Sequence, residues 1–202
     1  MIKIAPNGLQ AAPDGLWIID QVDLKIYKVD WETGDVLFEA QTDTEHSSGI
    51  TIGGGYVWIA STFELQIAKV DMETGKTIVA SWREGMEGAS ETGAHGLEWR
   101  NGKIYIASPP SQFVHVVDTE TWTEEHAFRT PGLRNHGLAW QDDKLWVADT
   151  SAGTVNLLGT ADGRVYDVIR VEAPDEVHGM TMHDGVLWYC DAHNCAIGRL
   201  IV

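Results

Sequence analysis

The chain has 202 residues, of which 44% are hydrophobic and 22% charged, a composition typical of a globular protein with one substantial core. Its 30 acidic and 14 basic residues give a formal net charge of −16, which would repel nucleic acid and anionic membranes and argues against both as partners. There is no apolar run of about 18 residues, no long apolar stretch near the start, and only two cysteines, so we expect a cytoplasmic protein that neither crosses a membrane nor depends on disulfides.

A short aromatic motif recurs five times along the chain. Its copies are separated by 41, 47, 41 and 42 residues. Each copy follows a tight-turn signal such as PDG, GGG or HDG, and each turn follows a segment that begins with glycine, such as GITIG or GLAWQ. A turn between two apolar segments predicts a β-hairpin. In chain order the copies are LWIID (16–20), VWIAS (57–61), IYIAS (104–108), LWVAD (145–149) and LWYCD (187–191).

Two further strands follow the hairpin. KIYKVD and QIAKVD are third strands, WETGD and METGK are turns, and VLFEAQ is a fourth strand. Four short strands in each period of 40 to 45 residues are typical of a β-propeller blade, and no helical periodicity of any length is present. The sequence therefore predicts a single all-β domain over 1–202, a five-bladed β-propeller with four antiparallel strands in each blade.

The two ends of the chain suggest how the ring closes. The last repeat stops at AIGRLIV after only three strands, and MIKIAP precedes the first repeat. We expect this N-terminal strand to close the last blade, since it would cover an open sheet edge. Most of the nine tryptophans lie at repeated strand positions, where we expect them to pack between blades.

The segment HGLAWQDDKLWVADTSAGTV resembles the repeats of streptogramin B lyase and of lactonase-like propellers, the gluconolactonase and paraoxonase group. This resemblance extends over the whole chain as a blade pattern, although those proteins generally have six or seven blades. It implies catalysis on one face of the propeller without selecting a reaction. Plant-type glutaminyl cyclases are similar in blade number, but their specific motifs have no match here.

One repeated position points to a functional site. The residue before the glycine that opens each first strand is Asn7, Ser48, His95, His136 and His178 in turn. Because consecutive blades are neighbours, the three histidines should form an arc at the mouth of the central channel. The asparagine and the serine indicate that the fold itself does not require histidine there.

Three neighbouring imidazoles favour a metal site. Neutral imidazole binds first-row divalent metals well, and three protein ligands with an open position are usual in catalytic sites. We therefore expect His95, His136 and His178 to hold a divalent ion, zinc or manganese, that activates water. The predicted function is a metal-dependent hydrolase of small esters, lactones or phosphotriesters. The lactonase-like resemblance implies calcium held by oxygen ligands instead, so this nitrogen-rich arc departs from it.

Three further residues on the same face are candidates for catalysis. His46 lies two residues before Ser48, Glu45 precedes it, and His193 lies on the facing loop of the last blade. Glu45 and two other carboxylates, Glu176 and Asp191, could orient a histidine or act as a base.

Other interpretations remain open at this stage. The histidines could hold loops by hydrogen bonds, or act without metal as acids and bases. A lyase of the streptogramin type would use a histidine to remove a proton and a metal to stabilise the enolate. A non-catalytic propeller could bind a peptide or protein through Phe63, Phe113 and Leu133. The substrate beyond a small molecule and the oligomeric state are not indicated.

The remaining polar residues have simpler expected roles. Asp20, Asp149 and Asp191 recur at strand ends, where they could cap loops or support the site. Cys190 lies in a C-x2-H-x-C pattern with His193 and Cys195, but other blades have alanine at its position, so we expect a buried packing role. His115, His126 and His183 are expected at the surface. The longer loop 83–94 is either a lid or an insertion without function.

Overall fold

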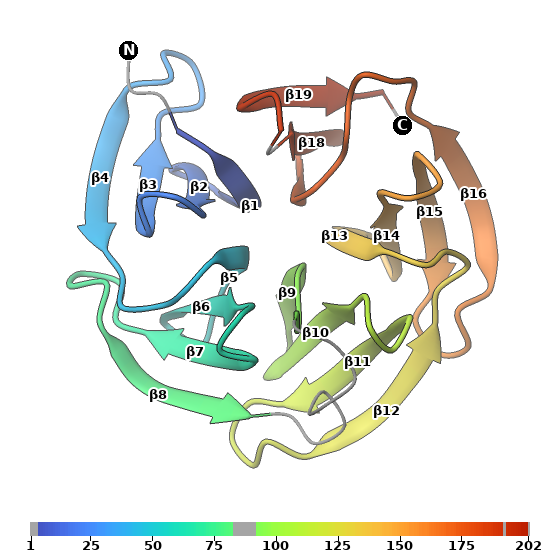
Figure 1. Cartoon of the computed structure of the whole chain (residues 1–202), viewed down its shortest axis with the longest axis horizontal. Helices are drawn as coiled ribbons and strands as arrows, with labels where there is room; N and C mark the ends of the chain where they lie inside the picture. Colours follow the sequence, from blue (N-terminus) through green and yellow to red (C-terminus); the bar gives the residue numbers. More distant parts are fainter. Residues whose placement is uncertain (1–3, 83–91, 192, 202) are drawn as a thin grey trace.

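The computed structural model describes residues 4–82, 92–191 and 193–201. These residues form nineteen β-strands in five antiparallel sheets and no helix, hence none long and apolar enough to cross a membrane. The sheets are arranged around a central axis like the blades of a propeller (Figure 1). The predicted five-bladed β-propeller is therefore confirmed.

Within each blade the strands follow one another from the axis outward, so that β1, β5, β9, β13 and β17 are innermost (Figure 1). The first two blades contain β1 (Pro6–Ala12), β2 (Gly15–Asp20), β3 (Lys25–Val29) and β4 (Val36–Gln41), then β5 (Ser47–Gly53), β6 (Tyr56–Ser61), β7 (Gln66–Val70) and β8 (Thr77–Trp82). The next two contain β9 (Leu97–Arg100), β10 (Lys103–Ser108), β11 (Phe113–Asp118) and β12 (Glu124–Arg129), then β13 (Asn135–Gln141), β14 (Lys144–Asp149), β15 (Thr154–Gly159) and β16 (Val165–Arg170). The fifth contains β17 (Met180–His183), β18 (Val186–Asp191) and β19 (Ala196–Leu200).

The fifth blade has three strands among the described residues. Residues 1–3 of the expected closing strand lie outside the described part of the chain. Of the rest, Ile4 and Ala5 are not in a strand, and Pro6 belongs to β1. Ile4 nevertheless packs against the same cluster as Trp188 and Ile197 of the fifth blade. The beginning of the chain therefore contributes to the seam between the first and last blades through packing.

Five hydrophobic clusters fill the spaces between neighbouring blades. Trp17, for example, packs with Ile50 of the second blade, and Trp146 packs with Met180 of the fifth. This pattern arises because alternate residues of a strand point to opposite faces of its sheet, and each face meets a different neighbour. The expectation that the repeated tryptophans pack between blades is confirmed.

Tight approach of the innermost strands explains the repeated glycine. A Cβ atom on Gly49 would lie 1.9 Å from the carbonyl oxygen of His95, and one on Gly96 would lie 2.1 Å from that of His136. Any larger residue would push the neighbouring blade outward. The glycine is thus required by the fold, whereas the side chain before it is left available for function.

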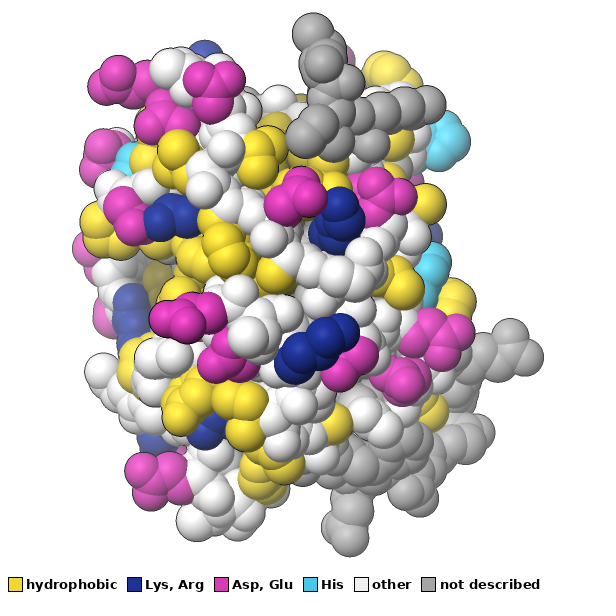
Figure 2. Space-filling view, turned by 90° about the vertical axis from the view of Figure 1, so that its left-hand side faces the viewer, with side chains coloured by type: hydrophobic (Ala, Val, Ile, Leu, Met, Phe, Trp, Pro, Cys, Tyr) yellow, Lys and Arg dark blue, Asp and Glu magenta, His cyan; other side chains and the backbone are white. Residues whose placement is uncertain are grey.

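Hydrophobic side chains on the outer wall of the propeller lie among charged ones. Val36 and Leu37 of β4 are exposed, as are Ile78 and Val79 of β8. Figure 2 shows acidic and basic side chains interspersed with such residues on one side of the molecule. The negative charge of the chain is thus spread over this wall.

Candidate active site

The structure brings the rings of His95, His136 and His178 together. The ring centroids of His95 and His136 are 4.2 Å apart, and those of His136 and His178 are 5.0 Å apart. His95 and His178 lie just before their innermost strands, whereas His136 is the second residue of β13. We call these three side chains the imidazole cluster.

His136 is a buried, neutral member of this cluster. Its Nδ1 atom is 2.9 Å from the carbonyl oxygen of Arg134. Because a carbonyl only accepts, Nδ1 carries the hydrogen and Nε2 keeps a free lone pair. The pKa of His136 is lowered to about 3, mainly by burial; the hydrogen bond to Arg134 opposes this shift, and the nearby His178 adds to it. The ring therefore stays uncharged at neutral pH.

His95 also lies in an environment that disfavours charge. Burial holds its pKa well below the ordinary value, and the neighbouring His136 and His178 add to the effect. Its Nδ1 atom is buried without a hydrogen-bond partner among the described residues. A buried polar atom without a partner is costly, so this nitrogen is an unsatisfied polar atom within the cluster.

His178 differs from the other two because both of its ring nitrogens face polar groups. Its Nδ1 is 2.9 Å from Oδ1 of Asn7. The Nδ2 atom of Asn7 donates to Gln21, which leaves Oδ1 as the acceptor for the Nδ1 hydrogen. Its Nε2 is 3.2 Å from Oε1 of Glu176. Burial lowers the pKa of His178, and the Glu176 carboxylate opposes this.

The same hydrogen bond, from a loop N–H to a side chain at the end of a strand, recurs in four blades and positions the loops that carry these residues. Asp149 at the end of β14 accepts a hydrogen bond from the backbone N–H of Arg134, two residues before His136. Asp191 at the end of β18 accepts one from Glu176, two residues before His178. Asp20 does the same for Ala5, and Ser61 for Glu45. Of the two expected roles for these aspartates, loop capping is the one that the contacts show.

Arg134 is a feature that the sequence reasoning missed. Its Nη1 atom is 3.9 Å from Oε1 of Glu176, and its side chain is 54% exposed. Arg134 and Glu176 occupy the same position, two residues before the repeated histidine in adjacent blades. Comparison of that position between repeats could have identified this pair.

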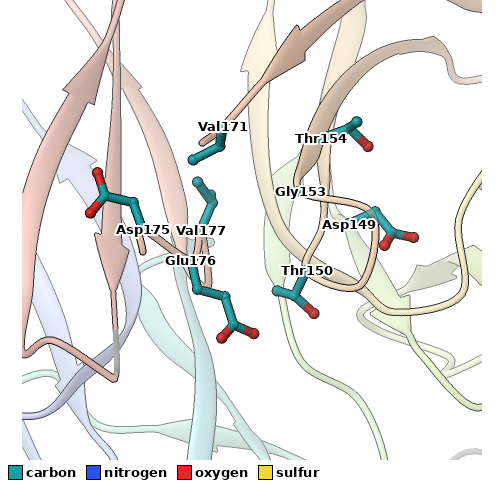
Figure 3. Close-up of a pocket in the computed structure, with 8 residues that line it drawn as sticks. All are labelled: Asp149, Thr150, Gly153, Thr154, Val171, Asp175, Glu176 and Val177. Atoms are coloured by element: carbon teal, nitrogen blue, oxygen red, sulfur yellow. The ribbon is translucent and has the colours of Figure 1, made fainter. Parts of the chain in front are cut away.

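A small pocket opens beside the cluster, between the fourth and fifth blades. Thr150 and Gly153 line one side, and Glu176 and Val177 line the other. Figure 3 shows Thr150 and Glu176 on these two sides. The Thr150 hydroxyl is 3.3 Å from Nδ1 of His136, so the pocket adjoins both His136 and the His178–Glu176 pair.

The three other candidate catalytic residues, Glu45, His46 and His193, differ in their relation to the cluster. Glu45 and His193 are exposed, and no hydrogen bond, ion pair or ring contact joins either side chain to the cluster in the described part of the chain. His46 lies closer, since its charge contributes to the low pKa of His95. Its ring stacks on Phe63 at a centroid distance of 4.0 Å. The arc of three histidines is thus extended by His46 alone.

The cluster has some features of a metal site and lacks others. Two imidazoles on a tetrahedral zinc ion would have centroids about 5 Å apart, given Zn–N distances near 2.1 Å. The pair His136–His178 matches this, whereas His95 and His136 are closer. Among the described residues, no three His, Cys, Asp or Glu side chains are placed to hold a metal ion. The predicted zinc or manganese ion therefore stays a prediction.

The structure also shows the positions of Cys190 and of the three histidines expected at the surface. Cys190 is fully buried, and burial raises the pKa of its thiol to about 12, which confirms the packing role. His126 is exposed, as expected. The surface prediction is wrong for His115, which is buried between Ser111 and Glu124. His183 is partly exposed beside its turn and stacks on Trp31, so the surface prediction holds there in part.

The three apolar residues expected to be exposed agree with that prediction only in part, and the prediction for the longer loop 83–94 stays open. Phe63 and Leu133 are 48% and 64% exposed, whereas Phe113 is half-buried. Residues 83–91 of the longer loop lie outside the described residues, so both interpretations of that loop stay open.

No model of a known protein family matches the chain, and no curated protein is similar to it in sequence. Solved structures share its fold. Glutaminyl cyclase from Myxococcus xanthus superposes with a TM-score of 0.77 at 12% identity, covering 99% of this chain and 92% of that one. Virginiamycin B lyase from Staphylococcus aureus gives 0.63 at 17% identity, covering 98% and 66%. A streptogramin B lyase structure gives 0.63 at 13% identity, covering 100% and 84%.

These likenesses extend the resemblance to the streptogramin lyases from short motifs to the whole fold. The neighbour from M. xanthus agrees with the similarity in blade number noted for glutaminyl cyclases. At such low identity the comparisons show a shared β-propeller and leave the reaction to be argued from the site. The likeness to gluconolactonase and paraoxonase stays a prediction.

Proposed function

We propose that this propeller is an acid–base enzyme of the lyase kind that cleaves a C–O bond in a small ester or lactone by elimination. The observation that carries the proposal is the placement of His178. One of its nitrogens is anchored by Asn7 and the other faces Glu176 beside the small pocket. The virginiamycin and streptogramin B lyases, which share the fold, support this class of reaction.

His178 suits the role of general base better than its neighbours. A base works best when its pKa is near the working pH. Burial makes His136 and His95 very weak bases, whereas Glu176 counteracts burial at His178. Nε2 of His178 therefore accepts the proton once the bound substrate displaces Oε1 of Glu176, which lies 3.2 Å from it, and the displaced carboxylate stabilises the imidazolium that forms.

The reaction follows from this assignment. Nε2 takes a proton from the carbon next to a carbonyl group, the electrons of that C–H bond form a carbon–carbon double bond, and the neighbouring C–O bond breaks. The leaving oxygen departs as a carboxylate with the electron pair of the broken bond. Arg134 lies near Glu176 with an exposed side chain, so its guanidinium stabilises the negative charge that develops on oxygen.

A metal-dependent hydrolase is the second candidate. His136 and His178 each donate Nδ1–H to an oxygen acceptor, an arrangement common among metal-ligating histidines. Together with the free Nδ1 of His95, these rings offer nitrogen ligands suited to zinc or manganese. Such an ion would supply activated water for hydrolysis of esters, lactones or phosphotriesters.

A product assay with the full chain separates the two candidates. Esters that carry an acyloxy group β to a carbonyl would be incubated in 18O-labelled water, with His178→Gln as the test variant and His126→Gln as the control. Elimination predicts a conjugated double bond, no 18O in the products, and loss of activity only in His178→Gln.

Incorporation of 18O, with about one equivalent of bound metal, would instead support the hydrolase. The metal content of wild type and of the His95→Ala, His136→Ala and His178→Ala variants would be measured by inductively coupled plasma mass spectrometry. The absence of any turnover would contradict both candidates.

A further inference from the structure

A stacked pair of aromatic rings lies on the face that carries the imidazole cluster. The rings of His46 and Phe63 are parallel within 2°, with centroids 4.0 Å apart. Phe63 is 48% exposed. The backbone of His46 has a φ of 46°, in the left-handed region that residues other than glycine adopt less often. We call this pair the aromatic platform.

The platform lies alongside His95. Thr62, the residue before Phe63, donates a hydrogen bond from its hydroxyl to the carbonyl oxygen of Ala94 at 2.8 Å. Ala94 directly precedes His95. His46 is also close enough for its charge to lower the pKa of His95. The hydrogen bond, together with this electrostatic effect, places the platform next to the cluster.

The exposure of Phe63 differs from that of the hydrophobic residues on the outer wall. Those residues belong to the outermost strands, where a blade always presents one edge to solvent. Phe63 lies in the loop after β6, and the other blades have Val22, Pro110, Ser151 and His193 at this position, so the fold does not require a phenylalanine there. A parallel stack with His46 holds its ring in a defined plane.

We infer that the aromatic platform binds a planar apolar group of the substrate, so that substrates with an aryl substituent are preferred. The inference rests on the proposed function for its role in turnover, but the binding itself can be tested alone. Aromatic contacts of this kind contribute about 0.5–1.5 kcal/mol, which corresponds to a preference of up to about tenfold.

A ligand-observed NMR experiment tests the binding. Saturation transfer to benzyl alcohol would be compared with transfer to cyclohexylmethanol, which is apolar but not planar. The proteins would be wild type, Phe63→Ala and Leu133→Ala, the last removing a more exposed apolar residue that lies in another loop. We expect benzyl alcohol to bind wild type and Leu133→Ala, with about two- to tenfold weaker binding to Phe63→Ala. Equal signals in Phe63→Ala and wild type, or equal binding of both alcohols, would overturn the inference.

Binding and turnover, measured together, show whether a negative result contradicts the aromatic platform or the proposed elimination. His178→Gln should bind benzyl alcohol as wild type does, because it leaves the platform intact. If benzyl alcohol binds in this way but no elimination is detected with any substrate, the proposed function is wrong and the platform stands. If elimination is detected with equal kcat/KM for aryl and alkyl substrates, the platform is wrong and the proposed function stands.

Discussion

His178 and Asn7, which are 171 residues apart in the sequence, are joined by a hydrogen bond of 2.9 Å across the seam between the last and first blades. The contact that orients the proposed base is therefore also a contact that closes the ring. Formation of the site depends on closure of the propeller, because neither residue can hold this geometry within its own blade.

Replacement of Asn7 tests the positioning of His178. We expect Asn7→Ala to lower kcat by about tenfold or more, since the imidazole loses the acceptor that orients it, and to destabilise the fold by about 1 kcal/mol. Asn7→Asp keeps an acceptor and adds a negative charge, so it should recover most of kcat while raising the pKa of His178. The measurements are steady-state kinetics over pH and NMR titration of the histidines. A kcat in Asn7→Ala equal to that of wild type would contradict this role.

Removal of the Glu176 charge should change the pH dependence of the reaction. The Glu176 carboxylate raises the pKa of His178 against the effect of burial. Glu176→Gln should therefore lower that pKa and shift the acidic limb of the kcat/KM profile to lower pH. Glu172→Gln, which changes an exposed carboxylate at the start of the same loop, serves as the control. An acidic limb that stays in place in Glu176→Gln would show that this pair does not govern the base.

Glu98 should make the stability of the protein depend on pH. Its side chain is buried in β9, and burial raises its pKa to about 8. The folded state therefore favours the protonated acid, and its stabilising effect is complete below the unfolded pKa of about 4.3 and is lost as pH rises to about 8. Glu98→Gln cannot ionise, so at pH 8 it should be more stable than wild type by up to about 4 kcal/mol.

The corresponding measurement is urea unfolding between pH 4 and 9. Glu120→Gln, at an exposed turn, should follow the wild-type curve. Parallel pH profiles for wild type and Glu98→Gln would disprove the assignment.

The seam between the first and last blades also has an aromatic contact on a tight turn. His183 stacks on Trp31 with a centroid distance of 3.8 Å and an interplanar angle of 3°, and Trp31 also meets Trp188 at 5.4 Å. We expect His183→Ala to lower the free energy of unfolding by about 1 kcal/mol. His193→Ala, at an exposed position in the same blade, should change it by less than about 0.5 kcal/mol. Equal unfolding midpoints for the two variants in urea would rule out a contribution of the stack to closure.

The architecture and the location of the candidate site could both be predicted from the sequence. The period of the aromatic motif and the hairpin turns are local properties. At Asn101 and Gly102, for example, both residues have positive φ, as a two-residue hairpin turn between β9 and β10 requires. The repeated position before the glycine was sufficient to place His95, His136 and His178 together, because equivalent residues in adjacent blades are necessarily neighbours.

The chemistry open to those histidines depends on contacts that form when the chain folds. The partners of His178 come from its own loop and from the opposite end of the chain, and the low pKa of His136 results from burial by surrounding blades. The repeat pattern likewise does not show that His115 is enclosed or that Arg134 approaches Glu176. Ring orientation, protonation and burial depend on contacts between residues far apart in sequence, which a local pattern does not encode.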